Sequence, residues 1–374
     1  MSNSIILQRL TKQHSLTFLI GFLILSFVFL ARHSHEQVFD YVRGSAHQPA
    51  FDRVDATALE KVIEALYKPR VHSITAESFT DDTGEVFHLT GKPFYEQKLG
   101  SRVLILDADT RPMTDDGQLF SKGGVKWPNT DAMSAGILSH YLYAKIHGYD
   151  YQFVQNKQFS NWSQTWVKVP EIKDALMTHD YVVFLDQDAM FRYPALPLEW
   201  LMNHWQHNDQ TSLMLAAEPD KEYNTDGNGT LYFNTGFIIA QNSTRTHDII
   251  DAWLDCPKGI KYDACRRFAW DWPHEQAALV GFVKQHEFTN PSDIRSVPCA
   301  EANGSPWTVE EHGCRGSLVR HLWLNGKNHQ PTELIDQVMG YFMPALYSDF
   351  RTAHKAAVVP NEEPTTQEQV KISR

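Results

Sequence analysis

The chain has 374 residues, of which 42% are apolar and 21% are charged, and this composition excludes a wholly disordered, collagen-like or coiled-coil protein. Its 34 basic and 45 acidic residues give a formal net charge of −11. Because an acidic chain without a basic cluster binds polyanions poorly, we expect no nucleic-acid partner. A small molecule that carries phosphate groups is a different case, since a few cationic side chains or one metal ion can hold it.

Residues 15–31 form an uncharged apolar run. As a helix this run would be roughly 25 Å long, near the lower limit for crossing a bilayer. Arg9 and Lys12 precede it, and positive charge before a first span favours a cytosolic N-terminus. The run therefore predicts a transmembrane signal anchor, with a cleaved signal peptide as the alternative. Both interpretations export the rest of the chain, which the first of them places on the lumenal side of a membrane.

The chain divides into five predicted segments. They are a cytosolic tail at 1–14, the signal anchor at 15–31, a stem and domain edge at 32–98, a folded domain at 99–354 and a disordered tail at 355–374. The last segment is polar and contains prolines, which is typical of a chain that cannot bury enough apolar surface to fold.

Cysteines and glycosylation sequons agree with export. An even number of cysteines in an oxidising compartment predicts two disulfides, and local pairing is the simplest of three connectivities. It would join Cys256 to Cys265 and Cys299 to Cys314. Four sequons add mild support, at Asn161, Asn228, Asn242 and Asn303.

Apolar runs and amphipathic segments alternate from residue 102 onward. Predicted strands cover residues 103–106, 151–154, 181–185, 213–217 and 231–240. Predicted helices cover residues 56–67, 131–147, a segment opened by Pro170, 246–254 and 274–285. This alternation predicts an α/β layered fold with a mostly parallel sheet, whose ligands bind at the carboxyl ends of the strands.

Two Asp-x-Asp pairs follow such strands. Asp186 and Asp188 come directly after the run 181–185. Residues i and i+2 of a strand point to the same side, about 6–7 Å apart, so both carboxylates can reach one hard cation such as Mg²⁺ or Mn²⁺. A divalent ion bridges carboxylates to a diphosphate and neutralises it as a leaving group. The alternative is two solvated aspartates in a turn.

Asp107 and Asp109 form the second pair. An apolar strand followed by Asp-x-Asp also begins phosphatases of the haloacid-dehalogenase type, but their motif has Thr or Val four residues after the first Asp, where this chain has Arg111. The remaining interpretations are a nucleotide contact at the end of the first strand and a plain turn.

Several segments taken together resemble glycosyltransferase family 34. The matching pieces, in chain order, are Trp166-Val-Lys168-Val-Pro170, Tyr181-Val-Val-Phe-Leu-Asp186-Gln-Asp188-Ala-Met, Phe233-Asn234-Thr-Gly236-Phe, Glu275-Gln276-Ala-Ala-Leu and Leu318-Val-Arg-His321. The segment from His321 to Lys327 is also similar to the His-x-x-Gly-x-x-Lys motif that closes glycogenin-like transferases. Members of family 34 are retaining α-galactosyl-, α-mannosyl- and xylosyltransferases. The resemblance implies an α/β domain of the Rossmann-like GT-A fold, behind the N-terminal transmembrane helix.

The resemblance also implies a set of site residues. Asp186, Asp188 and His321 would hold Mn²⁺ or Mg²⁺, since two hard oxygens and one imidazole suit such an ion. Further residues would contact the nucleotide, the diphosphate or a sugar: Asp107, Asp109, Lys168, Asn234, Gly236 and Lys327. Gln276 or its neighbour Glu275 would lie near the anomeric carbon. The plain alternatives are a structural histidine, solvated lysines and a strand bulge at Gly236. The tryptophans could stack on sugar rings or pack in the core.

These features predict a single-pass type II Golgi glycosyltransferase. The donor would be a nucleotide-diphosphate sugar, either a UDP- or a GDP-sugar, and the acceptor a glycan or glycoprotein. Two alternatives come from other classes: a non-catalytic lumenal carbohydrate-binding or scaffold protein, and a metal-dependent phosphohydrolase that uses Asp107 and Asp109.

Overall fold

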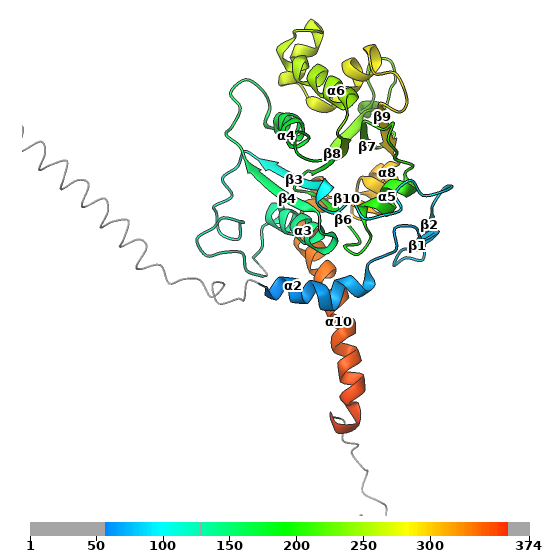
Figure 1. Cartoon of the computed structure of the whole chain (residues 1–374). Coiled ribbons are helices and arrows are strands. Elements are labelled where there is room, and N and C mark those ends of the chain that lie inside the picture. Colours follow the sequence, from blue (N-terminus) through cyan, green and yellow to red (C-terminus); the bar gives the residue numbers. More distant parts are fainter. Residues whose placement is uncertain (1–56, 128, 358–374) are drawn as a thin grey trace, which may run out of the picture. The chain divides into compact units, whose positions relative to one another are not determined.

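A computed structural model describes residues 57–127 and 129–357 (Figure 1). The predicted signal anchor at 15–31 lies outside the described residues, as do the predicted cytosolic tail and residues 32–56 of the predicted stem. None of the helices in the described ranges has the length and hydropathy needed to cross a membrane.

A six-stranded sheet forms the centre of the domain, in the order β4-β3-β5-β8-β7-β9. Its strands are β3 (Val103–Asp109), β4 (Asp150–Gln155), β5 (Tyr181–Leu185), β7 (Leu213–Ala217), β8 (Phe233–Gln241) and β9 (Ile294–Val297). Only β8, of the strands in this sheet, runs antiparallel to its neighbours, so the predicted mostly parallel sheet is confirmed.

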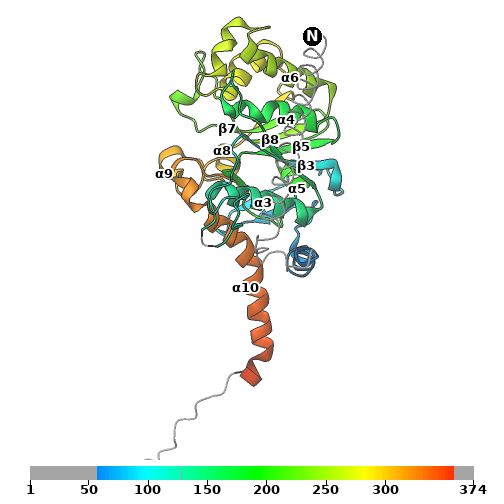
Figure 2. The same ribbon diagram turned by 90° about the vertical axis from the view of Figure 1, so that its left-hand side faces the viewer.

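The sheet has apolar layers on both faces, which explains why its strands are continuous apolar runs. On one face, Leu104 and Leu106 of β3 pack in a cluster that includes Trp166 and Ile172. On the other face, Val103 and Ile105 pack with Tyr143 and Trp200. Helices α4 (Lys168–Ala175) and α6 (Thr244–Asp255) cover the first face, and α3 (Ala132–His147) and α5 (Leu198–His204) cover the second (Figure 2).

The ends of α3 match the sequence prediction. The Asp131 side chain accepts a hydrogen bond from the Ser134 amide at 3.2 Å, and Gly148 ends the helix with a φ of 76°. Helix α4 begins at Lys168, two residues before the predicted start at Pro170, because proline is tolerated in the first turn. The predicted helices at 56–67 and 274–285 are confirmed, as α2 (Ala58–Val62) and α7 (Glu275–Ala278), each followed by a π-helical turn.

Several elements carried no clear signal in the sequence. They are β1 (Ser78–Thr80), β2 (Val86–His88), β6 (Ala189–Phe191), β10 (Val319–His321), α5, α8 (Cys299–Ala302), α9 (Val309–His312) and α10 (Gln330–Ala357). Helix α10 continues to Ala357, past residue 355, where the disordered tail was predicted to begin, and residues 358–374 of that predicted tail lie outside the described residues.

Both local disulfides are confirmed, Cys256–Cys265 and Cys299–Cys314. One of the four sequons is inaccessible in the folded chain, because the Asn303 side chain is fully buried and its Nδ2 donates to the Ala217 carbonyl at 3.0 Å.

Candidate active site

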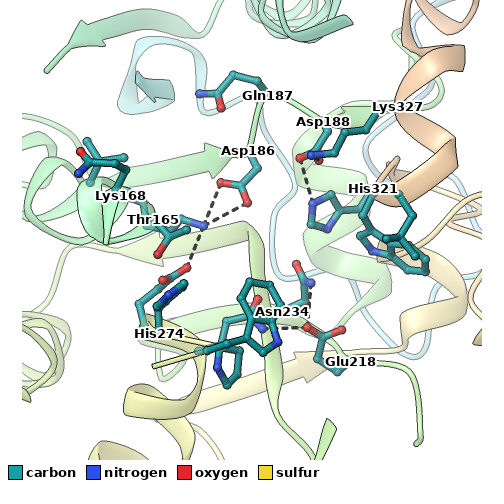
Figure 3. Close-up of a pocket in the computed structure, with 18 of the residues that line it drawn as sticks. Thr165, Lys168, Asp186, Gln187, Asp188, Glu218, Asn234, His274, His321 and Lys327 are labelled. Carbon is teal, nitrogen blue, oxygen red and sulfur yellow. Dashed lines mark hydrogen bonds and ion pairs between the residues drawn. The ribbon is translucent and has the colours of Figure 1, made fainter. Parts of the chain in front are cut away.

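A cavity of about 660 Å³ opens at the carboxyl ends of β3, β5 and β7 (Figure 3). Nine residues predicted from the sequence contribute to its lining: Asp109, Lys168, Asp186, Asp188, Asn234, Glu275, Gln276, His321 and Lys327. The other two, Asp107 and Gly236, do not line it. The carboxyl edge of the sheet therefore collects most of the predicted site.

Asp186, Asp188 and His321 form an Asp–Asp–His cluster, with one possible ligand atom from each lying within 4.8 Å of the others. Strand β6 follows the Asp-x-Asp turn and pairs antiparallel with β10, which places His321 opposite Ala189. The His321 Nε2 consequently lies 3.2 Å from Asp188 Oδ1. The small β6–β10 sheet thus joins groups that are 133 positions apart in the chain.

Gly236 makes room for the His321 imidazole. A Cβ atom at this position would lie 2.2 Å from His321 Cε1 and 2.7 Å from Nε2. The Gly236 carbonyl also accepts a hydrogen bond from the Asp186 amide at 2.8 Å. Gly236 therefore makes space for His321 and accepts a hydrogen bond from Asp186. The sequence had suggested a different role, in which Gly236 approaches a sugar.

Lys168 and Lys327 approach the cluster from opposite sides (Figure 3). The buried Lys168 Nζ lies 2.9 Å from Asp186 Oδ1 and 3.2 Å from Glu275 Oε1, and it donates to the Thr235 carbonyl at 3.2 Å. Lys327 Nζ lies 2.9 Å from Asp188 Oδ2, and its side chain is 42% exposed. Lys168 thus braces Asp186, whereas Lys327 stays accessible at the cavity.

These contacts shift the pKa values of Lys168 and of the two aspartates in the cluster. Burial alone would lower the pKa of Lys168, but Asp186 and Glu275 raise it above its ordinary value. Burial raises the pKa of the Asp186 carboxyl. Burial would do the same for Asp188, but His321 and Lys327 hold its pKa below the usual range. The two carboxylates of the cluster are therefore electrostatically distinct.

Glu218 is a cavity residue that the sequence analysis missed. Its Oε1 accepts hydrogen bonds from Asn234 Nδ2 at 3.0 Å and from Gln276 Nε2 at 2.9 Å. The Gln276 Oε1 in turn accepts from the Thr235 amide at 3.1 Å. Glu218 directly follows β7, so the rule that polar groups after parallel strands face the ligand would have found it.

Glu275 and Gln276 take different positions, although they are adjacent on α7. Glu275 is 3% exposed and accepts a hydrogen bond from Thr235 Oγ1 at 2.8 Å. Burial would raise its pKa, but Lys168 lowers it. Glu275 is therefore the counter-ion of Lys168, while Gln276 contacts the Glu218 carboxylate.

The second Asp-x-Asp pair requires a correction. Asp107 has no exposed surface, and its oxygens lie 2.9 Å from His140 Nδ1 and 2.7 Å from the Tyr151 hydroxyl, which donates to it. It lies behind the cavity, so the nucleotide contact predicted for it does not fit the structure. Asp109 does line the cavity, and Arg111 Nη2 donates to its Oδ2 at 2.6 Å.

Exposed aromatic groups border the same cavity. Trp272 is 79% exposed and Tyr223 is 68% exposed, and both contribute to the lining. Trp272 meets the His274 ring edge to face, with the ring centroids 5.6 Å apart. His274 has a φ of 52°, unusual for a residue with a side chain, directly before Glu275 and Gln276. Trp253, in contrast, is buried in the core.

Comparison with known proteins covers part of this site, without Asp109, His321 and Lys327. A model of the galactosyl transferase GMA12/MNN10 family matches residues 128–294, which include Asp186, Asp188, Asn234 and Gln276. The resemblance to family 34 is confirmed.

Two relatives come from Arabidopsis thaliana. Xyloglucan 6-xylosyltransferase 1 is 28% identical over 121 residues, which are 31% of this chain and 25% of that protein. Xyloglucan 6-xylosyltransferase 4 is 26% identical over 123 residues, 31% of this chain and 22% of that protein. The chain thus spans about a quarter of the length of the curated relatives it matches.

Similar solved structures are also glycosyltransferases, at low identity. One is a glycosyltransferase involved in glycosylation of the major capsid of PBCV-1, with 12% identity and a TM-score of 0.44, which covers 62% of this chain and 98% of that one. Another is the galactosyltransferase LgtC in complex with donor and acceptor sugar analogs, with 13% identity and a TM-score of 0.37, which covers 63% of this chain and 95% of that one.

Proposed function

We propose that the chain is a glycosyltransferase that moves a sugar from a nucleotide-diphosphate donor, a UDP- or GDP-sugar, to a glycan or glycoprotein acceptor. The observation that carries this proposal is the Asp–Asp–His cluster in the wall of the cavity. The family resemblance over residues 128–294 supports it. A GT-A fold and retention of configuration, the stereochemical course of family 34, are part of the same proposal.

The donor atoms of the cluster fit a divalent cation. Two carboxylates and one imidazole suit Mn²⁺ or Mg²⁺, and their atoms are close enough to share one ion. Such an ion, when bound, would neutralise charge on the diphosphate leaving group. Gly236 leaves space for the imidazole, and Lys168 holds Asp186 in place. The accessible Lys327 ammonium adds positive charge beside the diphosphate position.

The rest of the cavity would hold the sugars. Glu218 accepts hydrogen bonds from the amides of Asn234 and Gln276, which fixes both side chains in the cavity wall where a hexose or pentose would bind. Gln276 is the group we place nearest the anomeric carbon. Trp272 and Tyr223 offer exposed ring faces on which an acceptor sugar can stack.

The location of the enzyme is proposed on separate grounds. Both pairs of cysteines form disulfides, which are typical of an oxidising compartment. Together with the apolar run at 15–31, they support a single-pass type II protein of the Golgi membrane with a lumenal catalytic domain.

The test is a transfer assay with the full chain in detergent. UDP-xylose, UDP-galactose and GDP-mannose would be offered with Mn²⁺ and a glucan or mannan oligosaccharide. We expect transfer from one donor, and its loss in excess chelator and in Asp188→Ala, while both disulfides stay intact in the variant. Undiminished transfer in excess chelator would contradict the proposal. Glycan binding without turnover of any donor would favour the carbohydrate-binding alternative. The phosphohydrolase alternative gains no support, since Asp107 is buried.

A further inference from the structure

Helix α10 is built from two different halves. Its inner half is fixed to the domain by buried polar side chains. Gln337 Nε2 donates to the Phe191 carbonyl at 2.7 Å, Glu333 pairs with Arg320, and Gln330 donates to the carbonyl of Gln187 in the Asp-x-Asp turn. These contacts give the helix a fixed direction relative to the domain.

The outer half of α10 (residues 338–353) extends away from the domain, as both ribbon views show (Figures 1 and 2). It carries seven large apolar side chains that are 37–59% exposed. They are Val338, Met339, Phe342, Met343, Leu346, Tyr347 and Phe350. At about 100° per residue they share one side of the helix, which we call the apolar face of α10.

This arrangement reverses the usual one, in which a surface helix buries its apolar side and exposes its polar side. The side of α10 turned to the domain contains Gln330, Glu333 and Gln337, and ends where Tyr341 stacks on Tyr67 with the ring centroids 4.4 Å apart. A contiguous exposed apolar patch of this kind marks an interaction surface. A helical segment of this length that is held by few tertiary contacts is also only marginally stable in water.

The spacing along the apolar face fits a partner helix. Met339, Met343, Leu346 and Phe350 follow one another at intervals of four, three and four residues. This is the alternation that places side chains along the seam between two packed helices. Phe342 and Tyr347 flank this seam and would widen the contact.

We propose that the apolar face of α10 binds the same face of a second copy of the chain and forms a two-fold symmetric homodimer. Half-exposed side chains of roughly 150–250 Å² each leave on the order of 600 Å² on one copy. Two copies would therefore bury at most about 1,200 Å² in total, which reaches the lower end of the range for a specific interface. A self-complementary patch on one helix satisfies the requirement of two-fold symmetry.

A lipid surface fits this helix less well. Helices that lie in the membrane interface are rich in Lys and Arg opposite their apolar side. Residues 338–353 contain a single basic side chain, Arg351, and it is balanced by Asp349. A seam with heptad spacing and almost no charge favours a protein partner, and this pairing is independent of the proposed sugar transfer.

The test is capture between two differently tagged full-length copies, co-expressed and solubilised in mild detergent. We expect the wild-type copies to purify together, and at least a tenfold loss of capture in the triple variant Phe342→Asp, Leu346→Asp and Phe350→Asp. Met177→Asp is the matched control, because Met177 is 73% exposed but lies on another surface. Capture that is absent in the wild type, or that survives the triple variant, would overturn the proposal; survival would point to residues 15–31.

A second measurement covers the case in which the triple variant fails to fold. Leu346→Cys lies on the seam, whereas Ser348→Cys is also exposed but lies on the opposite side of the helix. A short bismaleimide applied to membranes that contain the full chain should cross-link the first variant into dimers and leave the second monomeric. If the reagent labelled both cysteine variants equally and neither formed dimers, the pairing would be contradicted. Binding of the wild-type chain as a monomer to neutral phosphatidylcholine vesicles would contradict it as well.

Discussion

Gly236→Ala tests the close approach of the Gly236 backbone to the His321 ring of the Asp–Asp–His cluster. The new methyl would lie 2.2 Å from His321 Cε1, 2.7 Å from Nε2 and 2.8 Å from Nδ1. All three distances are below 3.0 Å, closer than Cβ atoms approach other groups in real structures. The atoms met belong to the imidazole ring itself, which cannot bend away as the end of a long side chain can. His321 is 6% exposed and belongs to β10, which is paired with β6, so the ring has little room to move away.

The size of the effect follows from these contacts. Overpacking of a tight interior costs about 1–3 kcal/mol. Displacement of a ligand-supporting contact typically lowers metal affinity or activity by about 10–100-fold. We expect Gly236→Ala to fold, to melt a few degrees lower, and to need at least about tenfold more Mn²⁺ for half-maximal binding.

Manganese binding by the full chain, followed by electron paramagnetic resonance, is the direct assay, since it does not depend on the identity of the donor. Gly281→Ala is the matched control, because nothing lies within 4 Å of a Cβ at that position. Its Mn²⁺ titration should superimpose on that of the wild type. If Gly236→Ala gave the same titration and the same melting temperature as Gly281→Ala, the imidazole would not be packed on Gly236 as described, and the proposed role of His321 would fall with it.

Three further predictions concern other parts of the molecule. Glu218→Gln should lower transfer by about 10–100-fold, more than it changes Mn²⁺ affinity, because the neutral amide is a weaker acceptor for Asn234 and Gln276 and its Nε2 would face the Asn303 Nδ2; steady-state kinetics against Mn²⁺ titration separates the two effects. Lys168→Met should cost about 3 kcal/mol in urea unfolding, since it leaves Glu275 buried without its cation and removes the partner of the partly buried Asp186, and a wild-type midpoint would contradict the charge pairing. Burial lowers the pKa of His147 to about 3. Between about pH 6.5 and pH 3 this imidazole is protonated in the unfolded chain but neutral in the folded one. The free energy of unfolding should therefore fall by about 1.4 kcal/mol for each pH unit as the pH drops through this range. His147→Gln should flatten that slope, and an unchanged slope would refute the assignment.

Local sequence was enough for elements whose signal lies in neighbouring residues. The run 181–185 is apolar throughout because β5 is covered on both faces, and the two aspartates after it mark the edge where ligands bind. Asp131 and Gly148 set the ends of α3 through their own side-chain and backbone preferences. The cysteines pair locally, which is the simplest of the three connectivities that four cysteines allow.

Contacts between elements far apart in the chain decided the role of each site residue. Asp107 and Asp109 lie on the same side of β3, but His140 of α3 covers the first and leaves the second at the cavity. From the sequence, Lys168 was a candidate diphosphate contact or a solvated lysine, yet α7 places Glu275 beside its buried ammonium. No local pattern contains this information, because it depends on which element packs over a given turn of a strand.

The sequence by itself therefore determined the α/β class, the strand ends that carry carboxylates and the resemblance to family 34, because each depends on residues adjacent in the chain. Only the tertiary structure decided that Glu275 pairs with Lys168 and that α10 turns its polar side inward. Both outcomes depend on the direction in which a side chain points after distant elements have packed, and the free energy of that packing is shared among residues far apart in sequence.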